Sequence, residues 1–186
     1  MANPQGKGTL PCLQALQDAR PKEVANKVPA TLYEDFVLSA LVLNAHFKFK
    51  PVPARDYYLY LKGSQWLMSL VAPHEWVRTS ERHFVARCAL RMDMTWQVDM
   101  DARALKNDGV QGALRSHLGG FADALEEAGS FLGALPYYKR ELPYYQRVLA
   151  SGLAASLHQS SQWLDRNGFE RLENLASGRT LLDAVS

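Results

Sequence analysis

Residues 83–92 read HFVARCALRM, and this stretch shows the clearest alternation of apolar and other side chains in the chain. A period of two places successive side chains on opposite faces of a β-strand. One face then carries Phe84, Ala86, Cys88, Leu90 and Met92. We therefore expect an antiparallel strand here, with this apolar face buried in the core and the other face half-exposed.

Further strands are predicted on both sides of this stretch. Residues 57–61 read YYLYL, a composition that strands favour. Gly63-Ser64 follows as a hairpin turn signal, and residues 65–71 again alternate. With a short strand at about 95–98, these segments predict a three- or four-stranded antiparallel β-meander.

Helical periodicity precedes and follows the predicted sheet. Before it, a capping box formed by Thr31 and Glu34 predicts a helix over about residues 32–47. After it, Asn107 or Asp108 is placed to cap a helix whose apolar stripe extends to residue 132.

A last helix is predicted over residues 143–166, with Asn167-Gly168 as its C-terminal cap. The sequence thus predicts an α+β fold, in which an N-terminal helix packs on the β-meander and a C-terminal helical hairpin follows. The expected segments are a polar N-terminal arm (1–30), a helix-plus-sheet domain (31–100) and a helical C-terminal half (101–186). We expect a chain that ends at Arg103 to fold by itself.

Composition limits the classes to which the chain can belong. Its 186 residues are 47% apolar and 22% charged, which is typical of a globular protein of about one domain. A formal net charge of +2 gives no strong attraction for a polyanion. Neither an apolar leader segment nor an apolar run near the roughly 18 residues needed to span a bilayer is found. We therefore expect a cytoplasmic protein that does not enter a membrane.

Motifs for metal or nucleophilic chemistry are incomplete. Cys12 and Cys88 belong to no C-x-x-C pair, and Arg78 stands where an H-E-x-x-H motif would place its second histidine. The Gly6–Thr9 segment lacks the spacing of a phosphate-binding loop. We expect no metal, cofactor or catalytic residue, although the sequence leaves open a pairing of Cys88 with His74 or His83.

Two carboxylate-tryptophan pairs follow successive predicted strands. The candidate binding residues are Tyr58, Tyr60, Glu75, Trp76, Asp93 and Trp96. If the two loops meet at one end of the sheet, these side chains form a recognition site for a basic peptide or a small ligand. Alternatively, each carboxylate caps a turn and each tryptophan fills the core.

A repeated Leu-Pro-Tyr-Tyr segment gathers four tyrosines between the predicted C-terminal helices: Tyr137, Tyr138, Tyr144 and Tyr145. Tyrosine is enriched where proteins meet. We expect this corner to contribute to an interface with a protein partner or with a second copy of the chain, as a homo-oligomer.

The stretch 57–96 resembles the family called domain of unknown function 2452. The resemblance rests on three patterns of that family: a Tyr-Tyr-Leu-Tyr strand (57–60), a Ser-x-x-x-Pro-x-Glu-Trp segment (69–76) and an Asp-x-Thr-Trp segment (93–96). The Asn-Pro-x-Gly-Lys start at residues 3–7 also fits. Val77 and Ala86 replace glycines of the family pattern. The resemblance covers about half the chain and implies no particular activity.

The sequence favours a non-enzymatic protein-interaction or adaptor module. The alternative is a small-molecule-binding protein or small enzyme that uses the aromatic-acidic end of the sheet. A third reading is weak binding of single-stranded nucleic acid through a region that interleaves basic and aromatic residues: Phe47-Lys48-Phe49-Lys50, Arg55 and Tyr57–Lys62. Near-neutral charge makes nucleic acid the least favoured partner.

Overall fold

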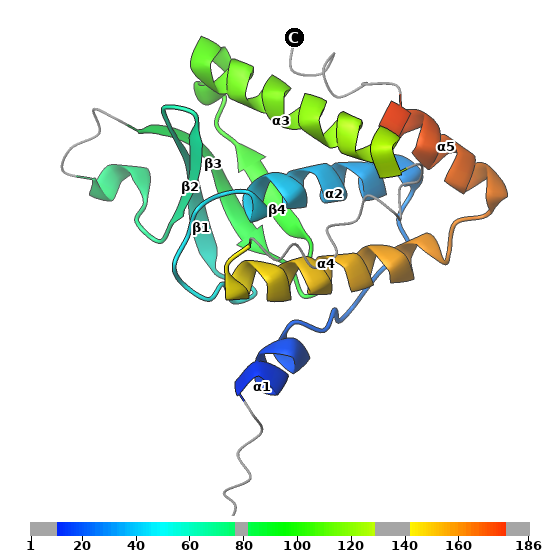
Figure 1. Cartoon of the computed structure of the whole chain (residues 1–186). Helices are drawn as coiled ribbons and strands as arrows, with labels where there is room; N and C mark the ends of the chain where they lie inside the picture. The colour runs from blue at the N-terminus through cyan, green and yellow to red at the C-terminus, as the bar shows by residue number, and fades with distance from the viewer. Residues whose placement is uncertain (1–10, 77–81, 129–141, 178–186) are drawn as a thin grey trace, which may run out of the picture.

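The strand predicted at residues 83–92 forms β3 (His83–Leu90), a central strand of a four-stranded antiparallel sheet (Figure 1). This arrangement comes from a computed structural model, which describes residues 11–76, 82–128 and 142–177. The other strands are β1 (Asp56–Lys62), β2 (Gln65–Ser69) and β4 (Trp96–Met100). The helices are α1 (Pro11–Asp18), α2 (Pro29–Leu43), α3 (Asp108–Ala128), α4 (Tyr144–Ser161) and α5 (Arg166–Ser177), with 3-10 turns η1 (Pro73–Glu75) and η2 (Ala104–Lys106).

The α+β class is confirmed, but the order of the strands in the sheet is not that of a β-meander. The order is β2-β1-β3-β4, so two hairpins lie side by side and the central pair is β1 with β3. The β1–β2 turn is at Gly63, whose φ of +58° suits glycine. Because β2 and β3 are not paired, the segment between them passes from the edge of the sheet back to its centre.

A β-bulge changes the predicted faces of β3. Cys88 pairs with Tyr57 and Ala86 with Leu59, but the next pair joins Phe84 to Tyr60, so Val85 is an extra residue in β3. Ala86, Cys88 and Leu90 are buried as expected. The prediction that Phe84 shares their face is wrong, because its ring lies against the Tyr58 and Tyr60 rings, at 6.3 and 5.7 Å.

The strand also ends earlier than predicted. β3 stops at Leu90, and Met92 lies in the following turn, where its side chain is exposed instead of buried in the core.

Helix α2 begins before the predicted capping box. Pro29 occupies its first turn, and its N-cap residue Val28 makes no side-chain cap. Proline fits the first helical turn because its missing N–H is not needed there. Thr31 therefore lies inside the helix.

The C-terminal helices pack around α2 rather than mainly against each other. Figure 1 shows α2 between α3 and α4, and α2 contacts α3, α4, α5 and the sheet. Phe121 of α3 sits edge-on to Phe36 of α2, with ring centres 4.9 Å apart. Gln146 of α4 donates from Nε2 to the Ala45 carbonyl at 2.6 Å, just after α2 ends. Among the described residues, the expected pairing of two helices as a hairpin is replaced by packing on this shared central helix.

The buried residues of α2, the sheet and the C-terminal helices form one hydrophobic cluster. Leu59 of β1, Phe36 of α2 and Leu153 of α4 belong to it. The segments 31–100 and 101–186 therefore share a core, which removes the basis for expecting a folded chain that ends at Arg103.

Two helix ends show how local capping sets the boundaries. Asn107 caps α3 as predicted, because its Oδ1 accepts the Val110 N–H at 3.0 Å. The predicted cap at Asn167-Gly168 is wrong. The chain turns earlier, at Asp165. The Asp165 Oδ1 accepts the Gly168 N–H at 2.7 Å, and helix α5 begins at the next residue, Arg166.

None of the helices in the described part of the chain is both long and apolar enough to cross a bilayer.

Candidate functional site

The six predicted binding residues do not form one site. Tyr58, Tyr60 and Trp76 lie on the outer face of the sheet, whereas Trp96 pairs with Leu90 on the core face and is buried. Asp93 lies in the β3–β4 turn and is bonded to the segment before α2. The sheet itself separates the two carboxylate-tryptophan pairs.

The outer-face group holds the β2–β3 connection against the sheet. Trp76 donates from Nε1 to the Tyr60 hydroxyl at 3.0 Å, and that hydroxyl donates to the Val71 carbonyl at 2.9 Å. Burial raises the pKa of Tyr60. Glu75 accepts the Ala72 N–H at 2.7 Å, and Arg82 lies 4.3 Å from the centre of the Trp76 ring. The contacts of this group are internal ones that fix a loop.

A buried charge network fixes the β3–β4 turn. Lys27 Nζ lies 2.7 Å from Asp35 Oδ2 and 2.6 Å from Asp93 Oδ2, while Arg91 Nη1 lies 2.6 Å from Asp35 Oδ1. Asp93 Oδ1 also accepts the Thr95 N–H and hydroxyl, at 3.0 and 2.6 Å. Asp93 therefore caps a turn, and the two buried carboxylates are balanced by Lys27, whose side chain is 12% exposed, and by Arg91, whose side chain is 40% exposed.

We expect this network to make stability sensitive to acid. Burial acts to raise the pKa of Asp93, but the bonds from Lys27 and Thr95 outweigh it and hold the pKa below its usual 3.8. The unfolded chain then takes up this proton more readily than the folded one, so stability falls as pH drops through 4. In urea unfolding between pH 7 and 3, Asp93→Asn should be less stable at pH 7 and show a flatter decline below pH 4. Parallel curves for the two proteins would contradict this assignment.

Tyr144 and Tyr145 lie in the first turn of α4, and Tyr137 and Tyr138 fall outside the described residues. The Tyr144 and Tyr145 rings meet edge to face with centres 5.4 Å apart, and both side chains are exposed. Tyr145 borders a cleft that the sequence did not reveal.

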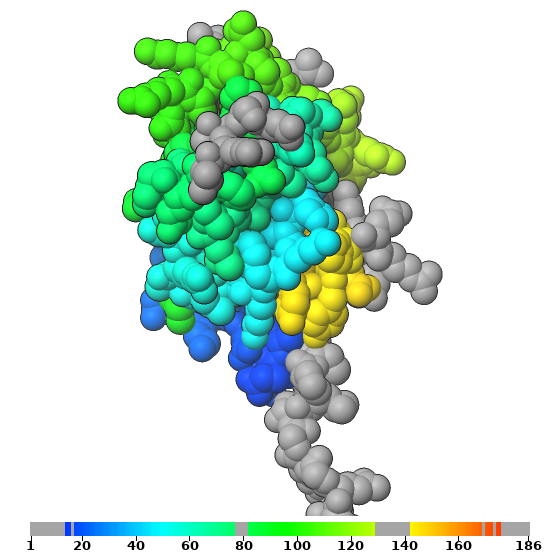
Figure 2. All heavy atoms as spheres, turned by 90° about the vertical axis from the view of Figure 1, so that its left-hand side faces the viewer, coloured from blue at the N-terminus to red at the C-terminus, as the bar shows by residue number. Residues whose placement is uncertain are grey.

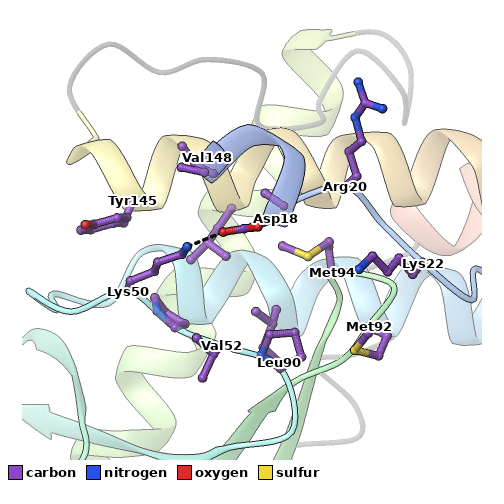
Figure 3. Close-up of a pocket in the computed structure, with 15 residues that line it drawn as sticks. Asp18, Arg20, Lys22, Lys50, Val52, Leu90, Met92, Met94, Tyr145 and Val148 are labelled. Carbon is purple, nitrogen blue, oxygen red and sulfur yellow. Dashed lines mark hydrogen bonds and ion pairs between the residues drawn. The ribbon is translucent and has the colours of Figure 1, made fainter. Parts of the chain in front are cut away.

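This cleft has a volume of about 340 Å³ (Figure 3). It lies between α1, residues 50–53, the turn after β3 and the start of α4. In Figure 2, α1 lies beside α4 at one end of the molecule. Most of its walls are apolar, formed by Ala15, Ala19, Pro51, Val52, Pro53, Leu90, Met92, Met94, Val148 and Leu149. We call it the α1–α4 cleft.

Basic side chains border the α1–α4 cleft. Lys50 pairs with Asp18 at 2.7 Å across one side of it (Figure 3). This bond, with help from Gln14 and Lys22, holds the pKa of Asp18 below its usual value. Lys22 points toward the cleft and Arg20 extends away along its border (Figure 3). Neither Arg20 nor Lys22 forms an ion pair with any residue that the structure describes.

Strong local contacts shape the walls of the cleft. Tyr57 of β1 fixes Val52, because its hydroxyl accepts the Val52 N–H at 2.7 Å. The Lys22 N–H donates to the Met92 carbonyl at 2.8 Å, which ties the N-terminal segment to the β3–β4 turn. Met94, at the centre of that turn, has a φ of +67°, which residues other than glycine rarely adopt.

Gly152 of α4 allows this close approach. A Cβ atom at that position would lie 2.5 Å from the Ala19 carbonyl oxygen and 3.1 Å from Met94 Cε. We expect Gly152→Ala to displace the segment after α1, with a loss of about 1–3 kcal/mol of stability. Trypsin should then cut after Lys22 several times faster, as measured by mass spectrometry.

Gly120→Ala is the matched control, because a Cβ there would meet nothing within 4 Å. This variant should be cut at the wild-type rate, and alanine in a helix should if anything stabilise α3. If Gly152→Ala also keeps the wild-type rate, Gly152 does not position the segment.

Cys88 is not placed for nucleophilic chemistry. Burial raises the pKa of the Cys88 thiol to about 12, and His74 and His83 are exposed while Cys88 faces the core, so the Cys–His pairing fails. Within residues 11–76, 82–128 and 142–177, no three His, Cys, Asp or Glu side chains gather as a metal site. The Gly6–Thr9 segment lies outside the described residues.

The aromatic rings proposed for nucleic acid pack inward. Phe49 stacks on Tyr57 with ring centres 5.4 Å apart, and Phe47 lies 5.5 Å from Phe49. Phe47 and Tyr57 are buried. Rings that are stacked on each other in the core do not offer the free faces on which bases stack.

Sequence reasoning missed the α1–α4 cleft because four distant segments build it. Some of its residues were singled out from the sequence, each for a different reason and none as part of a cleft: Tyr145, Lys50, Leu90 and Met92. At Val52 and Met92, the apolar pattern of the sequence does not distinguish an exposed residue of a cleft wall from a buried core residue. The proline-rich 51–53 segment, which cannot continue a helix, was the clearest available sign of a shaped loop.

Comparisons of this chain with protein-family models, with curated proteins and with solved structures found no match. The resemblance to the domain of unknown function 2452 family therefore remains a prediction.

Proposed function

We propose that this protein is a non-enzymatic protein-interaction module that holds an apolar group of a partner in the α1–α4 cleft. The observation that carries this proposal is the continuity between an apolar cleft and exposed apolar side chains at its mouth. Val52, Met92 and Tyr145 line the cleft and are also exposed. Apolar surface of this kind, bordered by polar residues, is typical of interaction sites.

The residue types at the mouth support a protein partner. Tyrosine, methionine and arginine are enriched at interfaces, and Tyr145, Met92 and Arg20 occupy three sides of the cleft. Tyr144 extends this surface beyond the cleft. A volume near 340 Å³ accommodates one or two large apolar side chains, which is how a buried anchor residue contributes most of the binding energy.

Backbone strain gathers at the same place. Glu23, Ala54 and Met94 are the non-glycine residues with positive φ in the described part of the chain. Met94 lines the cleft, and the other two directly follow the lining residues Lys22 and Pro53. Strained backbone of this kind is concentrated at functional sites.

The chemistry of the lining supports binding rather than catalysis. The lining residues that the structure describes include no histidine, cysteine or serine, and the one carboxylate among them, Asp18, is engaged by Lys50. A nucleophile with an adjacent base is therefore lacking at this cleft. The alternative of a ligand site at the aromatic-acidic end of the sheet is weaker, because its six residues lie on two sides of the sheet.

Binding of the uncharged fluorescent probe N-phenyl-1-naphthylamine tests this function. We expect saturable binding near one probe per chain. Met92→Asp should weaken it at least tenfold, because a carboxylate in an apolar wall must lose its water when the probe enters. Leu70→Asp is the control, because Leu70 is as exposed as Met92 (40% and 39%) but lies outside the cleft.

Circular dichroism should show that both variants fold. Absence of saturable binding would contradict the proposed function, and so would equal binding by wild type and Met92→Asp. Equal losses in both variants would place the probe elsewhere and count against the cleft.

A further inference from the structure

We infer that the partner of the α1–α4 cleft is an acidic protein segment, in which an apolar anchor residue is flanked by aspartate or glutamate. This inference rests on the proposed function and names the chemistry of the partner. It follows from how the charges around the cleft are compensated.

One lining cation, Lys50, and two basic residues outside the lining, Lys27 and Arg91, are in ion pairs within the protein. Lys27 is bonded to Asp35 and Asp93, Arg91 to Asp35, and Lys50 to Asp18. These groups have little charge left to offer a partner.

Arg20 and Lys22 are different. Both are exposed residues of the cleft border, and neither has an ion-pair partner among the described residues. Among the described lining residues, Arg20 and Lys22 are thus the cations outside an ion pair, although Lys22 also attracts Asp18 at longer range, and the one carboxylate, Asp18, is already paired with Lys50. The Lys22 backbone N–H is bonded to the Met92 carbonyl, which places the main chain of Lys22 beside the exposed apolar wall.

An apolar wall with two cations at one border selects a partner with the matching pattern. An aromatic or aliphatic side chain fills the cleft, and carboxylates within about three residues of it reach Arg20 and Lys22. Opposite charges at the border of an interface speed association and exclude partners of the wrong charge. A basic or neutral segment would fit the apolar cleft but lose this complementarity.

Selection from a random dodecamer peptide library displayed on phage tests the inference. Peptides selected on the wild-type chain should share an apolar residue with Asp or Glu nearby, more often than in the unselected library. On the Arg20→Glu/Lys22→Glu variant the apolar residue should persist without the acidic neighbours. A synthetic peptide of the wild-type consensus should bind this variant about tenfold more weakly at low salt, and the difference should shrink at high salt.

The control is Arg103→Glu/Lys106→Glu, which makes the same change in net charge at two exposed positions, the N-cap and the last residue of η2. It should select the same acidic peptides as wild type. Selected peptides without acidic enrichment, or identical peptides on the wild-type and cleft-variant chains, would overturn the inference, while probe binding that depends on Met92 would keep the proposed function.

Failure to select any peptide would also overturn the inference. Light scattering tests whether a second copy of the chain occupies the cleft. A wild-type dimer that Met92→Asp converts to monomer, while Leu70→Asp stays dimeric, would assign the cleft to a second copy of the chain instead of an acidic segment.

Discussion

A chain that ends at Arg103 should not fold. Such a truncation removes α3, α4 and α5, which cover α2 on the sides away from the sheet. Phe36 would lose the ring of Phe121, and the carbonyls of Leu43 and Ala45 would lose the Gln146 amide. Because α3, α4 and α5 contribute residues to the one hydrophobic core, we expect their loss to cost more than the 5–15 kcal/mol by which a typical domain is stable. Circular dichroism and urea titration should show no cooperative unfolding.

A chain that ends at Ser177 is the control, since it keeps every described helix and strand. It should unfold cooperatively at a urea concentration close to that of the full chain. A cooperative transition in the chain that ends at Arg103 would show that helix α2 and the sheet form an independent domain.

Replacing Lys27 with methionine should cost about 3–5 kcal/mol of stability, because it leaves the carboxylates of Asp35 and Asp93 in a poorly hydrated site without their shared cation. The side chain of Lys27 is only 12% exposed and those of its two partners are 8% exposed. Methionine keeps most of the volume, so packing changes little. The measurement is urea unfolding at pH 7.

Lys50→Met is the matched control. It breaks an equally short ion pair, Lys50 with Asp18 at 2.7 Å, but both side chains are 42% exposed. Water solvates the remaining carboxylate there, so the midpoint should stay close to that of wild type. If the two variants had equal midpoints, burial would not decide the contribution of these ion pairs.

Periodicity in the sequence was sufficient to predict the class of fold. Alternation at residues 83–90 and aromatic strand residues at 57–61 correspond to β3 and β1, and Asn107 caps α3. These features are local, because they depend on residues within one or two turns of each other. Element boundaries were less predictable where two local signals compete, as with Pro29 and Thr31 at the start of α2.

The remaining features depend on tertiary packing. The bulge at Val85 turns Phe84 to the outer face, and no change in the apolar pattern marks it. The order β2-β1-β3-β4 is set by which strands pair over a distance. The carboxylates of Glu75 and Asp93 fit the structural alternative that the sequence left open, since each caps a turn.

The α1–α4 cleft could not be predicted because its walls come from segments that extend from Ala15 to Leu149, across most of the chain. Gly152, for instance, matters because of two atoms on Ala19 and Met94, more than fifty residues away. Its role is invisible in the composition of α4.

An NMR titration of the ¹⁵N-labelled chain with N-phenyl-1-naphthylamine tests directly whether the α1–α4 cleft binds an apolar group. If the α1–α4 cleft is the binding site, the largest shift changes should fall on the backbone amides of Val52, Met92, Met94 and Tyr145, and should disappear in Met92→Asp. Changes centred instead on Tyr60 and Trp76 at the outer face of the sheet would contradict binding in the α1–α4 cleft.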